Sequence, residues 1–273
     1  MRYSRQALCW IAFLCVSAIT IGSAGAVGGV LEYAGLLAPL QNPEEVDPRD
    51  LQMLAILYIE DNQPSEAIPL LERSVDLYPE NGETYMWLGV AEFLTEQFSA
   101  AEESFMKALS RNPGLTETRN YLGLLRYRQG DLDAAVREFL TALRDPVYPP
   151  VSKARVRLNL GNVYLEVGNP AAALEHLANA AGGVAASDQL YAPLHIQLGK
   201  ALRQLDRIQE AIAAFIKVFD VDEMNVEAHL ELGMAYHDLS QVPAARRHLG
   251  KVIELAPGTE ASERAQAALS RLQ

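Results

Sequence analysis

The sequence predicts an all-α solenoid in which six helix–turn–helix repeats stack in a row and a C-terminal helix caps the last one. Three observations predict it. A small residue preceded by Leu recurs at steps of 34 or 38 residues, an Ala follows it by twelve residues, and a large apolar residue stands four residues after that Ala. A period of this length is typical of units that are each one pair of helices and that bury their apolar faces against their neighbours.

The recurring residues give each unit its predicted packing. The small residue in the first helix lets the two helices approach closely, and the large residue in the second helix fills the remaining space. The small residues are Ala55, Gly89, Gly123, Gly161, Gly199 and Gly233. The alanines are Ala67, Ala101, Ala135, Ala173, Ala211 and Ala245. The large residues are Leu71, Phe105, Phe139, Leu177, Phe215 and Leu249.

Proline and turn-forming clusters mark the ends of the elements. Pro79, Pro113 and Pro257 end the first, second and sixth units, since Pro cannot continue a helix. Turn clusters at 60–63, 129–131 and 167–170 fall between the two helices of their units. The predicted repeats are 48–81, 82–115, 116–149, 154–187, 192–225 and 226–258.

Two longer connections and a last helix complete the repeat region. Three prolines within 145–155 predict a loop over that whole stretch, and glycines predict a second loop in the segment 182–193. Residues 259–273 predict the capping helix, with Thr259 or Ser262 as its N-cap and Ala265, Leu269 and Leu272 on its apolar face.

The N-terminus has the pattern of an export signal. Basic residues precede an uncharged run at 7–21, and small residues follow, so residues 1–26 predict a signal peptide. If it is not cleaved, the segment to about residue 31 is long enough for a membrane anchor, and glycines at its end favour cleavage. Lipidation of Cys15 is a third, less favoured reading, because large residues precede this cysteine. Residues 27–47 predict a proline-containing lead-in.

Composition excludes several classes of function. Net charge is −12, with 35 acidic and 23 basic residues, which argues against nucleic-acid binding and against docking on an anionic lipid surface. Both cysteines, Cys9 and Cys15, lie in the leader, so neither a disulfide framework nor a Cys-based zinc site is expected in the remainder. The expected compartment is the periplasm or cell envelope, with an inner-membrane anchor as the alternative.

No group of residues in the sequence has the spacing of a known catalytic motif, so neither an enzyme nor a cofactor is expected. His195 and His229 occupy equivalent positions in first helices, and His176 and His248 in second helices, so packing explains them better than metal binding. The expectation is therefore no metal site and no small-molecule substrate.

A protein partner is expected to bind where the first helices line the inner side of the stack. Helical phase predicts an apolar and aromatic part in units two and three and a polar to basic part in units four and five. The predicted groove residues are Met86, Trp87, Val90, Phe93, Asn120, Tyr121, Leu124, Tyr127, Asn159, Asn162, Lys200 and Arg203. The asparagines would pair with a partner's backbone, and the two cations with a carboxylate.

The span from Pro48 to Pro257 resembles the tetratricopeptide repeat (TPR) family, which implies a right-handed superhelix and a protein-binding scaffold. The chaperone-clamp pattern of Lys and Asn is absent, since Gln52 and Ile56 stand at those positions. The stretch DPVYPPVSKARVRLNLGNVYLEVGN, residues 145–169, is similar to the TPR family of type IV pilus biogenesis and stability, which includes pilotins that help secretin rings assemble. Those pilotins are typically lipoproteins, and the sequence around Cys15 departs from that pattern.

This resemblance implies a scaffold that assists pilus or secretin assembly. A general periplasmic or membrane-anchored adaptor for another complex remains the alternative, and an enzyme is the least favoured. Whichever holds, a membrane would be contacted only through an uncleaved N-terminal segment.

Overall fold

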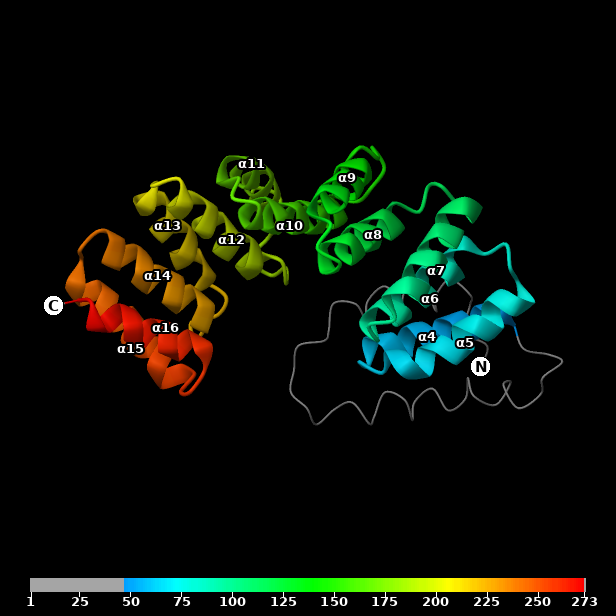
Figure 1. The fold of residues 1–273 in the computed structure, drawn as a ribbon, viewed down its shortest axis with the longest axis horizontal. Helices are drawn as coiled ribbons and strands as arrows, with labels where there is room; N and C mark the ends of the chain where they lie inside the picture. Colours follow the sequence, from blue (N-terminus) through cyan, green and yellow to red (C-terminus); the bar gives the residue numbers. More distant parts are fainter. Residues whose placement is uncertain (1–46, 273) are drawn as a thin grey trace. The chain divides into compact units, whose positions relative to one another are not determined.

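The computed structural model describes residues 47–272, which form helices and no strand (Figure 1). The predicted leader and nearly all of the lead-in lie outside these residues. The thirteen helices within 47–272 confirm the all-α fold, since they are six consecutive pairs and one further helix. They are α4 Pro48–Glu60, α5 Pro64–Leu77, α6 Gly82–Leu94, α7 Phe98–Arg111, α8 Thr116–Arg128, α9 Leu132–Leu143, α10 Pro150–Glu166, α11 Pro170–Ala181, α12 Tyr191–Gln204, α13 Ile208–Val218, α14 Val226–Asp238, α15 Val242–Leu255 and α16 Glu260–Ser270.

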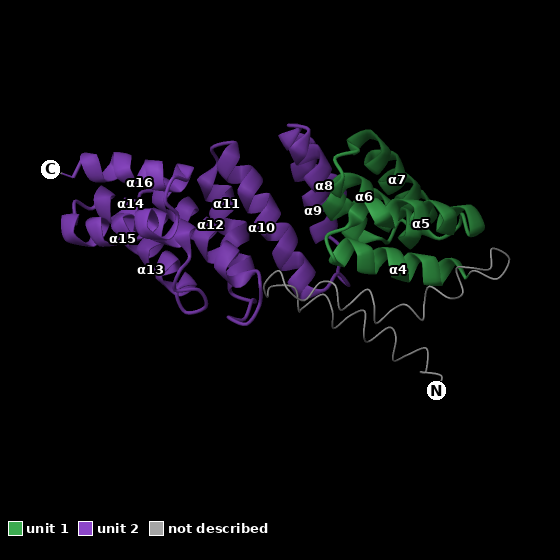
Figure 2. Ribbon diagram, turned by 90° about the horizontal axis from the view of Figure 1, so that it is seen from below, with its two compact units in different colours: residues 1–121 green, residues 122–273 purple. Residues whose placement is uncertain are grey.

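The chain divides into two compact units, residues 1–121 and 122–273, with the boundary inside α8 (Figure 2). In the first unit, α4 pairs with α5, α6 pairs with α7, and α4 also contacts α6. In the second unit, the first helices of successive pairs contact each other, α10 with α12 and α12 with α14, and α14 contacts α16. We call α10, α12, α14 and α16 the first-helix layer of the second unit.

The recurring small residue lies against the recurring large one, as the sequence predicts. A Cβ built on Gly199 would stand 2.3 Å from the Phe215 ring, and one on Gly89 would stand 2.6 Å from Phe105. Phe105, Phe139 and Phe215 are fully buried. A methyl group at Gly89 or Gly199 would therefore occupy the space that the facing ring fills.

The turn inside each pair has the same geometry in all six repeats. Seven residues after the small residue, the backbone takes a positive φ, and the next residue donates its N–H to a carbonyl five residues earlier. These are the two marks of a Schellman helix end. The positive-φ residues are Asn62, Glu96, Gly130, Gly168, Asp206 and Ser240. The corresponding hydrogen bonds are donated by Gln63, Gln97, Asp131, Asn169, Arg207 and Gln241.

Side-chain caps fix where several helices begin. The carboxylate of Asp47 accepts a hydrogen bond from the Arg49 N–H, and the Asn225 amide oxygen accepts one from the Ala228 N–H. Of the two candidates for the cap of the last helix, Thr259 is the N-cap, and its hydroxyl oxygen accepts from the Ser262 N–H. Ala265, Leu269 and Leu272 pack in the adjoining apolar cluster, as predicted.

The prediction of a loop throughout 145–155 is wrong in its second half. Helix α10 begins at Pro150, with Pro149 as its N-cap, and continues without interruption to Glu166. The reason is that a proline in the first turn of a helix costs no hydrogen bond, because the N–H it lacks would have no partner there, and its fixed φ suits the helix. The prolines therefore start this helix instead of preventing it.

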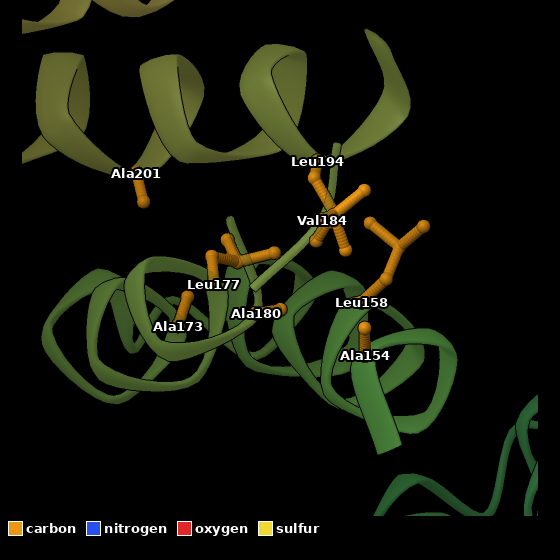
Figure 3. Packing of buried hydrophobic residues seen from close by; sticks show 8 residues of the cluster. All are labelled: Ala154, Leu158, Ala173, Leu177, Ala180, Val184, Leu194 and Ala201. Atoms are coloured by element: carbon orange, nitrogen blue, oxygen red, sulfur yellow. The ribbon is translucent and has the colours of Figure 1, made fainter. Parts of the chain in front are cut away.

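The core of the second unit is a series of apolar clusters shared by successive helices. In one of them, Leu194 and Ala201 of α12 point toward Leu177 of α11 and toward Val184 of the loop that follows α11 (Figure 3). Each cluster includes residues from at least two successive pairs or from the loop that joins them. Every first helix is thus held by its neighbours, which fixes the direction in which its remaining face points.

Candidate functional site

The predicted groove residues are distributed over both units. Six lie in the first unit, on α6 and the beginning of α8, and six lie in the second unit, on the end of α8, on α10 and on α12. In both units the residues come from first helices, so they lie on the helices that the sequence selected.

The aromatic group on α6 takes part in packing. Met86 and Val90 are buried, with 7% and 3% of their surface exposed. Trp87 is partly exposed and packs against the apolar cluster shared by the first two pairs. The Phe93 ring lies 6.0 Å from the ring of Phe98. Trp87 and Phe93 therefore retain the surface that a partner could contact, whereas Met86 and Val90 retain little.

The predicted residues on α8 also take part in packing inside the protein. Asn120 is buried, and Tyr121 stacks on Phe105 with ring centroids 5.9 Å apart. Leu124 and Tyr127 pack against the apolar cluster around Phe139. A hydrogen bond to the carboxylate of Glu166 raises the pKa of Tyr127, and burial adds to this effect. The Tyr127 hydroxyl thus joins α8 to the end of α10.

Helix α10 carries the predicted asparagines. Asn159 and Asn162 are both partly buried, on a helix whose Leu158 and Leu160 are in the core. The Asn162 Oδ1 atom is buried and has no hydrogen-bond partner among the described residues. This oxygen is out of a partner's reach, so only the exposed part of the Asn162 side chain is available on the first-helix layer.

The two predicted cations are already paired inside the protein. Lys200 of α12 forms an ion pair with Glu227 of α14, and Arg203 forms one with Glu231 of α14. The Arg203 Nε atom also lies 3.1 Å from Asp238 Oδ2. Their positive charge is therefore balanced within the layer, and a partner's carboxylate would have to compete with these acids.

Glu231 is the acid that sequence reasoning missed. Only 5% of the Glu231 side chain is exposed, and it lies between two arginines. One is Arg203, and the other is Arg264 of α16, with its nearest nitrogen 3.6 Å from the Glu231 carboxylate. The sequence places Arg203 and Glu231, 28 residues apart, in consecutive first helices, but it does not show that the two side chains meet. Ion pairs thus connect α12, α14 and α16 on the layer where binding was predicted.

The histidines take the packing positions that the repeat register predicts. His195 is 3% exposed and meets the Tyr191 ring edge-on at 4.4 Å, and His176 stacks on Tyr164 at 5.6 Å. Burial lowers the pKa of both imidazoles. Within residues 47–272, no group of three or more His, Cys, Asp or Glu side chains could hold a metal ion.

A scan against family models now decides the family. One tetratricopeptide repeat model matches residues 53–116 and 121–189, and a second TPR model matches 199–240, which together are more than half of the chain. The chain belongs to the tetratricopeptide repeat family. Tetratricopeptide repeats serve as scaffolds for protein interaction, so the first helices are the place to look for a partner.

Solved TPR structures share this fold. PilF of Pseudomonas aeruginosa is 20% identical, with a TM-score of 0.70 over 81% of this chain and 96% of that one. PilW, a widely conserved type IV pilus biogenesis factor, is 21% identical, with a TM-score of 0.70 over 81% of this chain and 98% of that one. YrrB, a TPR protein with an unusual peptide-binding site, is 19% identical, with a TM-score of 0.58 over 72% of this chain and 97% of that one. At such identities the likeness shows the fold.

A search of curated proteins found no match to this TPR chain. Among the helices of residues 47–272, none combines the length and the apolar character that crossing a membrane requires.

Proposed function

We propose that this TPR protein is an exported, non-catalytic scaffold of the cell envelope that binds an extended segment or a helix of a protein partner along its first helices. We propose further that the partner belongs to a type IV pilus or its secretin, whose assembly the scaffold assists. The layer of contacting first helices, with partly exposed aromatic and amide side chains, is the observation that carries the first part.

Each unit offers a binding surface of its own, made of the side-chain surface that packing leaves exposed. Trp87 and Phe93 of the first unit offer apolar and aromatic surface, which typically dominates the affinity of protein interfaces. Asn162 of the second unit is partly exposed, so the exposed part of its amide can bond to a partner's backbone. Lys200 and Arg203 act here through their ion pairs, which hold α12 and α14 in register, and they are not offered to the partner as free cations.

Three features support the pilus assignment. The structural similarity to PilW, a type IV pilus biogenesis factor, extends over 98% of the PilW chain. The stretch at 145–169 resembles the pilus family, and the leader-like segment at 1–26 is what an envelope protein needs. The absence of catalytic spacing supports a binding role.

The proposal is tested by capture from an envelope extract of the source cells, with the full chain immobilised and bound proteins identified by mass spectrometry. The wild type should capture pilus or secretin components. Trp87→Ala with Phe93→Ala should reduce capture about tenfold, because aromatic anchors dominate such interfaces. Asn162→Ala tests the second unit separately.

Met106→Ala is the matched control, since Met106 is 56% exposed on a second helix. It should leave capture unchanged. Circular dichroism should show nearly unchanged helical content in every variant. Equal capture by the wild type and both groove variants would refute groove binding, and capture of components from another envelope complex alone would refute the pilus role and support a general adaptor.

A further inference from the structure

Two imidazoles face each other inside the sixth helix pair. The Nδ1 atoms of His229 on α14 and His248 on α15 are 3.0 Å apart. The Nε2 atom of His229 lies 3.1 Å from the backbone carbonyl oxygen of Glu223, in the loop before α14. Phe219 lies 4.5 Å from the His229 ring, and Tyr236 lies 5.7 Å from the His248 ring. The pair therefore joins two helices and a loop inside an aromatic cluster.

The positions of the protons follow from the partners. A carbonyl oxygen only accepts, so the Nε2 atom of His229 carries a hydrogen and donates it to Glu223. The Nδ1 atom of a neutral ring in that tautomer is an acceptor. The hydrogen between the rings must then belong to His248, which donates from Nδ1 to His229. When both rings are neutral, these partners therefore fix the tautomer of each.

This contact can hold one added proton but not two. If one ring is protonated, the other still supplies a neutral Nδ1 atom that accepts the hydrogen between the rings, although the pair is then a partly buried cation. If both rings are protonated, both Nδ1 atoms carry hydrogens, and two donors facing at 3.0 Å repel. Acid therefore breaks the contact when the second proton is taken up.

The surrounding groups mostly favour the neutral pair. Burial lowers the pKa of His229, and Lys251 and Arg247 of α15 add to this, whereas the Glu223 carbonyl and Asp222 in the loop act against it. Burial also lowers the pKa of His248 to about 4, with further contributions from His229 and Arg247. Asp222 is thus the one acid among these groups that favours a charged ring.

The pair occurs once in the repeats. The equivalent positions of the fifth repeat hold His195 and Ala214, and those of the fourth hold Arg157 and His176. Each of these repeats has half of the arrangement, and neither has two imidazoles in contact. An effect of breaking a contact between two imidazoles should therefore be confined to the sixth pair.

We propose that His229 and His248 form an acid-sensitive latch that holds α14 to α15 and to the preceding loop, and that mild acid opens the sixth helix pair. This inference goes beyond the proposed function, because the opening requires no partner. Helix α14 also carries Glu227 and Glu231, which pair with α12, so opening would loosen the first-helix layer at the same place.

The direction of the pH dependence follows from proton uptake. Both rings have a lowered pKa in the folded state, so the opened state binds more protons below the ordinary value of 6.5. The latch is fully stabilising above about pH 6.5 and weakens as the pH falls toward about 4, where the folded state of His248 also takes up its proton.

Hydrogen exchange followed by mass spectrometry on the full chain tests the latch. After correction for the intrinsic pH dependence of exchange, amides in α14 and α15 should open about tenfold more often at pH 5 than at pH 7. Amides in α9, which carries no histidine, should show no such change. Uniform change throughout the second unit, or no change in α14 and α15, would overturn the proposal.

Two variants separate the latch from general acid sensitivity. His248→Gln retains an N–H that can be donated to His229 but removes one titrating ring, so the acid response of α14 and α15 should fall substantially. His176→Gln changes the equivalent residue of the fourth repeat, which has no facing imidazole, and should leave the response at its wild-type size. An undiminished response in His248→Gln, or an equal loss in both variants, would show that the pair is not responsible.

Discussion

At the scale of single residues, the repeat depends on one steric relation between a small residue and the large one that faces it. Gly161 lies against Leu177 and Gly233 against Leu249, with a built Cβ at 2.6 and 2.7 Å from the facing side chain. The facing residues are fully buried. Sequence periodicity predicted this relation because steric fit within one helix pair is a local property.

We predict that Gly199→Ala destabilises the protein. The added methyl group would stand 2.3 Å from the fully buried Phe215 ring, and overpacking of this kind costs about 1–3 kcal/mol. The control is Gly250→Ala on α15, where nothing lies within 4 Å of the built Cβ, so helix propensity should stabilise by up to about 1 kcal/mol. Urea unfolding of both variants measures the difference, and equal effects would contradict the steric explanation.

At the scale of helices, polar side chains connect consecutive first helices. Gln52 of α4 accepts hydrogen bonds from Asn81 at 3.0 Å and from Thr84 at 2.6 Å, at the beginning of α6. Between α12 and α14, ion pairs make the corresponding connection. One of their carboxylates, that of Glu231, is nearly inaccessible to water. The layer proposed to bind a partner is therefore held in place by its own side chains.

We predict that Arg203→Met destabilises the second unit by about 2 kcal/mol, because it leaves the buried carboxylate of Glu231 without its main partner. Lys251→Met is the matched control. Lys251 pairs with Glu254, whose side chain is 67% exposed, and a surface pair of this kind contributes at most about 1 kcal/mol. Thermal unfolding compares the two variants, and a loss no larger for Arg203 than for Lys251 would show that Glu231 does not depend on the pairing.

At the scale of the whole molecule, the function depends on where the chain resides. The described residues are an acidic TPR scaffold preceded by a segment with the composition of an export signal. The alternatives for that segment have different consequences, since a cleaved leader would release the scaffold into the periplasm and an anchor would hold it at a membrane. The proposed pilus role requires export in either case.

We predict that the mature protein begins near Val27, because small residues follow the apolar run at the position where a signal peptide is cut. Intact-mass measurement of the protein purified from its native envelope fraction determines the N-terminus. A chain that retains Met1 would indicate an uncleaved anchor, and a lipid on Cys15 would indicate a lipoprotein.

The sequence by itself determined the helix pairs, the small-against-large packing and the turns, because these depend on residues close together in the chain or in the same repeat position. Only the tertiary structure showed that Pro150 begins α10, that Lys200 and Arg203 are paired, and that His229 meets His248. Lys200 and Glu227 are 27 positions apart in the sequence, Arg203 and Glu231 are 28 apart, and the two histidines are 19 apart. These contacts depend on the rotation of each helix about its own axis, which the packing of whole neighbouring pairs decides and no local pattern specifies.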